Sequence, residues 1–207
     1  MRFLIDKSPH EVQRKHRSPL VCGQLITPLT GYRNWGGVYA VDNGAFSSFR
    51  KDGFVRILNR DISRHKKCLF VVCPDLVGDW QQTRQLFDEM KSLIPGCYGV
   101  AYVAQDHQPE NEIPWDEIAC LFVGGKDPWK DSEHAQSLVK SAKERRKHAH
   151  VGRVNEINRF TLFDSLGADT CDGSGIARYD HMLHKIELKL GMRKTNFESP
   201  NQTRHLF

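Results

Sequence analysis

Two acidic residues are the strongest candidates for chemistry in this sequence. Asp42 lies in Val-Asp-Asn-Gly-Ala-Phe, and Asp172 lies in Gly-Ala-Asp-Thr-Cys-Asp-Gly-Ser-Gly. Each follows a short apolar run and is closely followed by glycine, which lets the backbone turn sharply or approach a ligand. Carboxylates in such positions act as nucleophiles or carry protons. We predict that Asp42 and Asp172 are the central carboxylates of an active site, with Asp172 as the nucleophile.

Structural roles compete with this prediction. A helix N-cap is the alternative for Asp42 or Asn43, and a turn from Asp172 to Gly175 is the alternative for Asp172. Asp169 precedes Asp172 by three residues, and a strand points such residues to opposite faces. We therefore assign Asp169 a different role from Asp172, contact with the substrate.

Other polar or glycine residues also follow apolar runs. Asp75 comes directly after Val-Cys-Pro, and Arg153 comes after His-Val-Gly. Gln105 carries the paired donor and acceptor that can hold a planar amide or a base edge. Gly124 and Gly125 offer backbone N–H groups to a ligand. We predict that these residues bind the substrate, with ordinary loop positions as the alternative.

The elements that must position these residues are short apolar runs alternating with longer amphipathic segments. Strands that are apolar on both faces are buried on both sides, as in a parallel sheet covered by helices. The repeated strand–helix order predicts right-handed crossovers. The expected strands are residues 20–26, 38–41, 68–73, 99–104, 119–123, 148–151 and 169–171.

The expected helices lie between these strands. Residues 54–62 and 80–94 carry apolar side chains at three-and-four spacing, and residues 137–147 and 155–166 supply two more helices. Asp79 stands directly before the second of these segments, and we predict it as the N-cap.

An open doubly wound sheet and a closed barrel both fit this order. Six successive strands deliver a polar or glycine residue at or just past their carboxyl ends. An open sheet gathers ligand contacts at one switch point, whereas a barrel gathers every strand end into one ring. We therefore predict an α/β fold, a compact TIM-like barrel over residues 1–192, with one or two units missing or reduced at a length of 207 residues. Residues 193–207 have the composition of a disordered tail.

Bulk properties exclude several classes of protein. No apolar run reaches the roughly 20 residues of a membrane span, and the first residues do not form a secretory signal, so we expect a soluble, cytoplasmic protein without a membrane partner. Most of the 6 cysteines lie within or beside apolar runs, which predicts free thiols, and they form no CxxC pair, which predicts no metal site. We also expect no cofactor. The formal charge is +5, with basic residues concentrated in 140–147 and 185–194. That clustering suits a polyanionic partner, and a solvated helix face is the alternative.

Several segments together resemble the guanine transglycosylase superfamily. They stand in the family's order, cover most of the chain, and are closest to the DpdA-type enzymes, which insert 7-deazaguanine derivatives into DNA and are common in viruses and genomic islands. The segments are Val-Asp-Asn-Gly-Ala-Phe (41–46), Cys-Pro-Asp (73–75), Val-Ala-Gln-Asp (103–106), Leu-Phe-Val-Gly-Gly (121–125), His-Val-Gly-Arg-Val-Asn (150–155) and Gly-Ala-Asp-Thr-Cys-Asp-Gly (167–173).

The resemblance implies a TIM-like barrel that displaces guanine from its sugar through a covalent enzyme intermediate and lets a 7-deazaguanine take its place. It makes Asp172 the nucleophile toward the anomeric carbon and Asp42 the acid/base. It makes Asp75, Gln105 and the Gly124–Gly125 backbone the readers of the purine. The implied partners are DNA and a free base of the 7-cyano-7-deazaguanine type, in a host cytoplasm if the protein is viral.

A tRNA-modifying enzyme is the second choice within the superfamily. Those enzymes carry a zinc site of three cysteines and one histidine after the nucleophile strand, and no cysteine follows Asp172 here. The chain is also shorter than typical members, so we expect an element that binds nucleic acid to be either missing or supplied by a partner protein. The late basic segments are candidates to hold the phosphates that flank the target base. Outside the superfamily, the alternatives are a nucleoside or N-glycoside hydrolase and a catalytically silent nucleic-acid-binding barrel.

Overall fold

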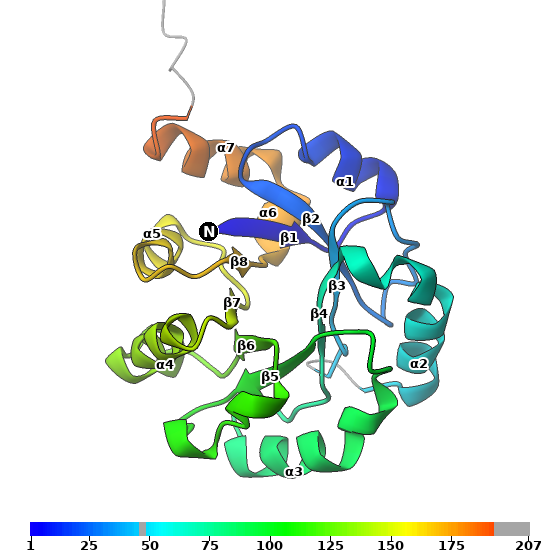
Figure 1. Ribbon diagram of the computed structural model, residues 1–207. Helices are drawn as coiled ribbons and strands as arrows, with labels where there is room; N and C mark the ends of the chain where they lie inside the picture. Colours follow the sequence, from blue (N-terminus) through cyan, green and yellow to red (C-terminus); the bar gives the residue numbers. More distant parts are fainter. Residues whose placement is uncertain (46–48, 193–207) are drawn as a thin grey trace, which may run out of the picture.

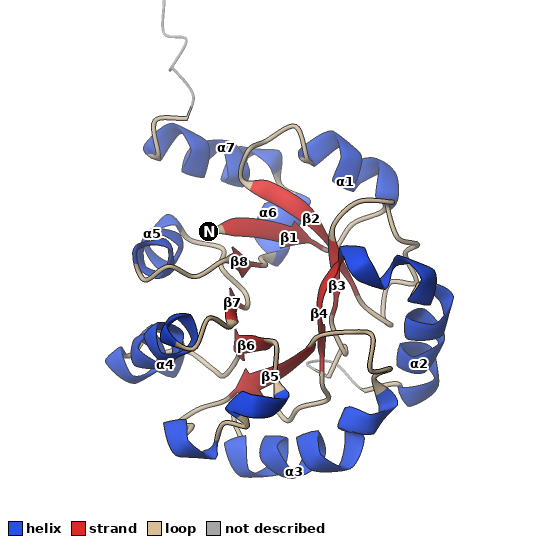
Figure 2. Ribbon diagram, viewed as in Figure 1, coloured by secondary structure: helices blue, strands red, loops and turns tan. Residues whose placement is uncertain are grey.

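The protein forms a closed barrel of eight parallel strands in sequence order, with helices around the outside (Figures 1 and 2). The computed structural model describes residues 1–45 and 49–192, so the predicted tail at 193–207 lies outside the described residues. The architecture confirms the predicted TIM-like α/β barrel. The strands are β1 (Arg2–Ile5), β2 (Val21–Ile26), β3 (Tyr39–Val41), β4 (Cys68–Val72), β5 (Val100–Ala104), β6 (Cys120–Val123), β7 (His148–Val151) and β8 (Thr170–Cys171).

Two of the connections between strands are reduced, as the chain length predicts. Residues 27–38, which join β2 to β3, contain no helix, and β5 is joined to β6 only through the short 3-10 turns η3 (Glu110–Glu112) and η4 (Trp115–Glu117). The remaining 3-10 turns are η1 (Ile62–Lys67), η2 (Lys91–Leu93) and η5 (Trp129–Asp131). The α-helices are α1 (Pro9–Lys15), α2 (Lys51–Arg60), α3 (Trp80–Met90), α4 (Glu133–Glu144), α5 (Ile157–Ser165), α6 (Ser174–Arg178) and α7 (Asp180–Lys189).

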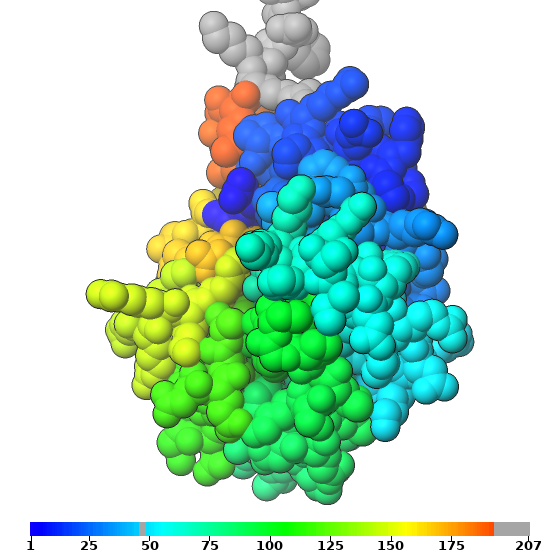
Figure 3. Space-filling view, turned by 45° about the vertical axis from the view of Figure 1, so that its right-hand side comes forward, coloured from blue at the N-terminus to red at the C-terminus, as the bar shows by residue number. Residues whose placement is uncertain are grey.

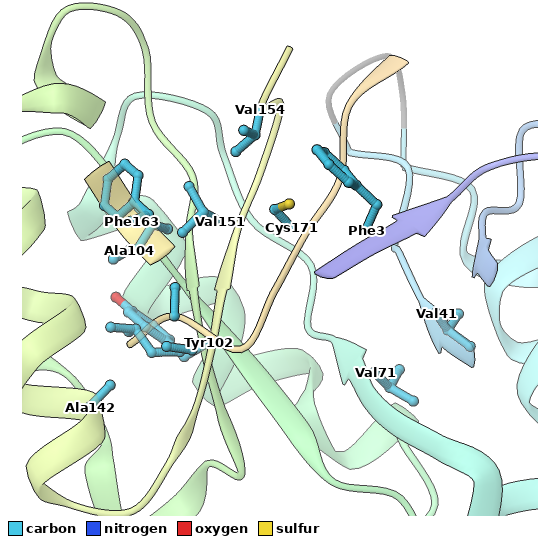
Figure 4. Close-up of a cluster of buried hydrophobic side chains, with 14 of the residues drawn as sticks. Phe3, Val41, Val71, Tyr102, Ala104, Ala142, Val151, Val154, Phe163 and Cys171 are labelled. Carbon is cyan, nitrogen blue, oxygen red and sulfur yellow. The ribbon is translucent and has the colours of Figure 1, made fainter. Parts of the chain in front are cut away.

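The strands bury both faces because alternate residues enter two separate apolar clusters. Val41, Val71, Tyr102 and Cys171 belong to the outer cluster, which also contains the buried side chains of the helices (Figure 4). A second cluster fills the inside of the barrel, and it includes Phe70. Since the last residue of β3, β5 and β8 faces outward, the residue that follows each strand faces the barrel axis.

The two ends of the described chain meet where the barrel closes. β1 pairs with both β2 and β8, and the first part of the chain, in blue, meets the last described part, in orange, at one end of the molecule (Figure 3). The buried Lys15 of α1 donates to the carbonyl of Ile176 at 2.9 Å and forms an ion pair with Asp180 at 2.7 Å. The hydroxyl of Ser18 donates to the buried carboxylate of Glu187. These contacts hold the last helix against the first and complete the outer layer.

Candidate active site

The carboxyl ends of the strands surround a cavity of about 420 Å³. This volume suits a small ligand or part of a larger one. Every strand contributes a residue at its carboxyl end or the residue just after it, as expected of a ring of strand ends. Of the residues predicted from the sequence, the lining includes Asp42, Asp75, Gln105, Gly124, Gly125, Arg153 and Asp172.

Asp172 directly follows β8 and turns into the cavity because Cys171 faces outward. Its Oδ1 accepts a hydrogen bond from the backbone N–H of Arg153 at 3.0 Å, and its Oδ2 lies 3.2 Å from Nε2 of His150. Arg153 adopts a left-handed backbone with φ of 58°, and its guanidinium donates to the carbonyl of Gly125. The Asp172 side chain is 17% exposed. It is therefore anchored on one side and open to a ligand on the other.

Asp42 follows β3 and lies in a different environment. Desolvation in the cavity raises the pKa of Asp42 to about 7, and the nearby charges of Asp172 and Asp75 raise it further, while the hydrogen bond from Gly44 N–H opposes the rise. A carboxyl group with a pKa near neutrality is suited to giving and taking a proton. The alternative prediction, a helix cap at Asp42 or Asn43, is wrong, because the capping position of α2 is Arg50.

Asp75 is held by two side-chain amides. Asn43 donates to Oδ1 at 2.7 Å, and Gln105 donates to Oδ2 at 2.6 Å. Burial raises the pKa of Asp75 to about 6, and these two hydrogen bonds limit the rise. The oxygen of Gln105 accepts from the N–H groups of Gly78 and Gly125, so three of its four hydrogen-bonding positions are occupied. Gln105 thus orients Asp75.

Gly124 and Gly125 line the cavity, but their N–H groups are not bare. The Gly124 N–H donates to the carbonyl of Ala104 at 2.9 Å, and the Gly125 N–H donates to Gln105 at 3.0 Å. The expectation that these groups bind a ligand is therefore corrected. Glycine is needed here for space: a Cβ on Gly125, where φ is 72°, would lie 2.5 Å from the carboxylate of Asp106.

Asp169 does not line the cavity, contrary to the predicted contact with the substrate. It stands at the start of β8, where its carboxylate pairs with Lys143 at 2.6 Å and accepts from the N–H of Ala149 at 2.8 Å. The separation of Asp169 from Asp172 agrees with the strand alternation expected from the sequence. Asp79 has the predicted capping role, since its side chain accepts from the N–H of Gln82 at 3.0 Å.

The basic segment at residues 140–147 lies at the wrong end of the barrel for the role expected of it. It covers the end of α4 and the approach to β7, and helices in this fold run antiparallel to the strands. The segment is therefore near the amino ends of the strands, opposite the cavity. Lys143 and Arg145 form ion pairs with Asp169 and Glu110. Basic residues favour helix C-termini because of the helix dipole, which explains this clustering without a ligand.

Sequence reasoning missed several residues that face the cavity. Lys130 is only 1% exposed, and its Nζ donates to the carbonyl of Gly152 at 3.0 Å. Burial, followed by the charge of Arg153, lowers the pKa of Lys130 to about 8. Lys130 stands in a polar segment that reads as an exposed loop, and only the turn η5 brings it inward. The other missed residues of the lining include Asp6, Thr27, Ser174 and Arg178.

Within residues 1–45 and 49–192, no group of three or more His, Cys, Asp or Glu side chains has the arrangement of a metal site. No helix in the described part of the chain is both long and apolar enough to cross a membrane. Comparison with protein-family models gives no match, and comparison with curated proteins gives none either.

Proposed function

We propose that the protein exchanges guanine in DNA for a 7-deazaguanine base through a covalent intermediate on Asp172. The observation that carries this proposal is the pairing of two different carboxyl groups in one cavity. Asp172 is anchored by an N–H donor and open to the cavity, whereas the pKa of Asp42 is raised to about 7. Breaking a glycosidic bond with retention of configuration requires one nucleophile and one group that moves a proton.

The proposed reaction is a double displacement. Asp172 attacks C1′ of the sugar as the bond to N9 breaks, and the protonated Asp42 gives its proton to the departing guanine. The Asp42 carboxylate then takes the N9 proton of the incoming base, whose N9 attacks C1′ and releases Asp172. Both carboxyl groups return to their starting states, so the exchange consumes no cofactor.

The polar residues around Asp75 fit a guanine-like base. The carboxylate of Asp75 is fixed by Asn43 and Gln105 and can accept hydrogen bonds from the ring N–H and amino groups of a purine. Lys130 uses one N–H bond on Gly152 and offers its others to an acceptor such as O6. We assign Lys130 the reading of the purine that was expected of the N–H groups of Gly124 and Gly125.

The size of the cavity limits which part of a nucleic acid can enter the site. A space of about 420 Å³ takes a base and its sugar but not a duplex, so the target nucleotide has to leave the stack. Arg178 and Arg153 line the cavity, and their cationic groups suit the flanking phosphates. The choice of DNA over tRNA follows from the DpdA-type resemblance and from the lack of any cysteine after Asp172 in the sequence.

The experiment is release and replacement of labelled guanine from duplex DNA, single-stranded DNA and tRNA, with and without 7-cyano-7-deazaguanine. We expect release from DNA with incorporation of the deazaguanine, and loss of both in Asp172→Asn. Asp88→Asn, an exposed carboxyl on α3, is the matched control and should behave as wild type. Release without incorporation would identify a hydrolase, and binding without release from either polymer would identify a silent barrel.

A further inference from the structure

A row of polar side chains runs through the otherwise apolar inside of the barrel and ends on Asp172. His150 of β7 is completely buried, and its ring packs 4.5 Å from Phe122 and 5.1 Å from Phe70 between centroids. Its Nδ1 lies 2.8 Å from the hydroxyl of Thr170 on the neighbouring strand β8. That hydroxyl lies 2.7 Å from Nε2 of His148. We call His148, Thr170 and His150 the His–Thr–His chain.

The chemistry of these groups sets the direction of every hydrogen bond in the chain. An ionised Asp172 only accepts, so Nε2 of His150 carries a proton and donates to Oδ2. With the ring proton on Nε2, Nδ1 of His150 is bare and accepts the single hydroxyl proton of Thr170. The Thr170 oxygen accepts in turn from Nε2–H of His148. All of the donors therefore point toward Asp172.

At the other end of the chain, Thr170 is the one described group within hydrogen-bond distance of the His148 ring. Burial lowers the pKa of His148 to about 4, against the opposing effect of Asp169, so His148 is neutral at pH 7 and carries one ring proton. Asp169 lies 4.0 Å from Nδ1 of His148 and is itself paired with Lys143. The thiol of Cys120, beside His150, stays protonated because burial raises its pKa.

We propose that the His–Thr–His chain orients Asp172 and stabilises it as the anion of the cavity. This inference rests on the proposed role of Asp172 as nucleophile. Asp6, Asp42 and Asp75 line the same cavity as Asp172, so any of these four carboxyl groups could carry a negative charge. The chain anchors Oδ2 while the N–H of Arg153 anchors Oδ1, and these two donors favour charge on Asp172. No proton is transferred, and His150 is a positioning residue.

The tautomers of the two histidines test the chain without any assay of activity. Ring-nitrogen NMR shifts of the ¹⁵N-labelled protein near neutral pH should show the Nε2–H form for both His148 and His150. Thr170→Val keeps the shape of the side chain and removes the hydroxyl, so Nδ1 of His150 loses its hydrogen bond and its ¹⁵N shift should change, whereas Thr170→Ser should retain the wild-type shift. An Nδ1–H form of His150 in the wild type, or an unchanged Nδ1 shift of His150 in Thr170→Val, would overturn the proposal.

The rate of guanine release tests the consequence for Asp172. We expect Thr170→Val and His150→Phe to lower kcat about tenfold through misplacement of the nucleophile, with little change in KM. The acid limb of the pH profile should move toward neutrality in both variants. Thr170→Ser and His150→Gln should restore much of the rate, because each replaces the missing hydroxyl or N–H donor. A rate loss with an unchanged pH profile would contradict the chain.

The two tests separate the two proposals. If wild type releases no guanine, the proposed function fails and the tautomer measurement still decides whether the chain exists. If wild type is active and the tautomers differ from those expected, only the chain fails. Melting temperatures of all four variants identify any loss that comes from unfolding, and Thr170→Ser is the smallest change among them.

Discussion

Desolvation gives the carboxyl groups of the cavity different protonation behaviour. It raises the pKa of Asp42 to about 7 and that of Asp75 to about 6, and it raises the pKa of Asp6 as well. Hydrogen bonds from Asn43 and Gln105 hold Asp75 nearer its ordinary value. A site that keeps a proton on one carboxyl while another is held by N–H donors is equipped for nucleophilic and acid/base steps together.

The pKa of Asp42 predicts a pH-dependent gain in stability for Asp42→Asn. A carboxyl with a raised pKa in the folded state stabilises the fold less as pH rises from about 4 to about 7. The full shift corresponds to roughly 4 kcal/mol, and the partial exposure of Asp42 reduces this. Urea unfolding should therefore show Asp42→Asn more stable than wild type by about 2 kcal/mol at pH 8. Near pH 4 the two should be equal, and an equal gain at both pH values would refute the assignment.

The same group predicts the alkaline limb of the reaction. In the proposed reaction Asp42 is protonated and gives its proton to the departing guanine, so guanine release should fall as pH rises through about 7. Single-turnover release across pH, with DNA as substrate, measures this limb. A rate that stays constant well above neutrality would exclude Asp42 as the proton donor.

Tight packing between the loops after β7 and β8 places Asp172. The carbonyl of Asp172 accepts from the N–H of Val154 at 2.6 Å. A Cβ on Gly173 would lie 2.2 Å from the carbonyl oxygen of Val154, which is backbone and cannot move aside. The two loops therefore approach one another only because residue 173 is glycine.

We predict that Gly173→Ala loses about 1–3 kcal/mol of unfolding free energy by overpacking and also loses guanine release, because Asp172 is adjacent. Gly96→Ala is the control, since nothing lies within 4 Å of a Cβ at that position. Urea denaturation and the release assay measure both effects. Equal behaviour of the two variants would show that the approach of the loops does not position Asp172.

The sequence predicts the elements with strong local patterns and misses those that depend on distant contacts. All seven predicted strands are present within one residue at each end. β1 was missed because it has four residues and is defined by pairing with β2 and β8. Helices α1, α6 and α7 were also missed; α1 and α7 are held by contacts such as Lys15 with Asp180.

The candidate site also divides into residues that a local pattern predicts and residues whose position depends on distant contacts. A polar residue after an outward-facing strand end turns inward, so local alternation placed Asp42, Gln105 and Asp172 correctly. Lys130 and His150 were missed because their directions depend on the η5 turn and on the neighbouring strand. The hydrogen bond from the Gly125 N–H to Gln105 joins residues that are 20 positions apart in the sequence, and no local pattern predicts it.

The barrel has two ends with different surroundings, and this polarity governs how a polyanion can bind. Arg178 lines the cavity at one end. Lys189 ends α7, which follows directly from Tyr179 and runs toward the other end. Both cations are exposed, so they form a matched pair for a test of which end meets the nucleic acid.

We predict that Arg178→Glu weakens DNA binding about tenfold and lowers the salt dependence by about one phosphate contact, because the proposed function places the DNA backbone at the cavity end. Lys189→Glu changes the net charge equally and should leave affinity nearly unchanged at physiological salt. Fluorescence anisotropy over a salt series measures both. An equal loss in the two variants would indicate an effect of net charge rather than a cavity-end site.

The most direct test of the central claim is detection of the covalent intermediate. Wild-type protein mixed with guanine-containing DNA, quenched in denaturant and digested, should yield a peptide carrying the sugar–DNA adduct on Asp172 by mass spectrometry. The adduct should be absent in Asp172→Asn and should disappear from wild type when excess 7-deazaguanine base is added before the quench. An adduct on Lys130, or exchange of the base without any adduct, would contradict the account.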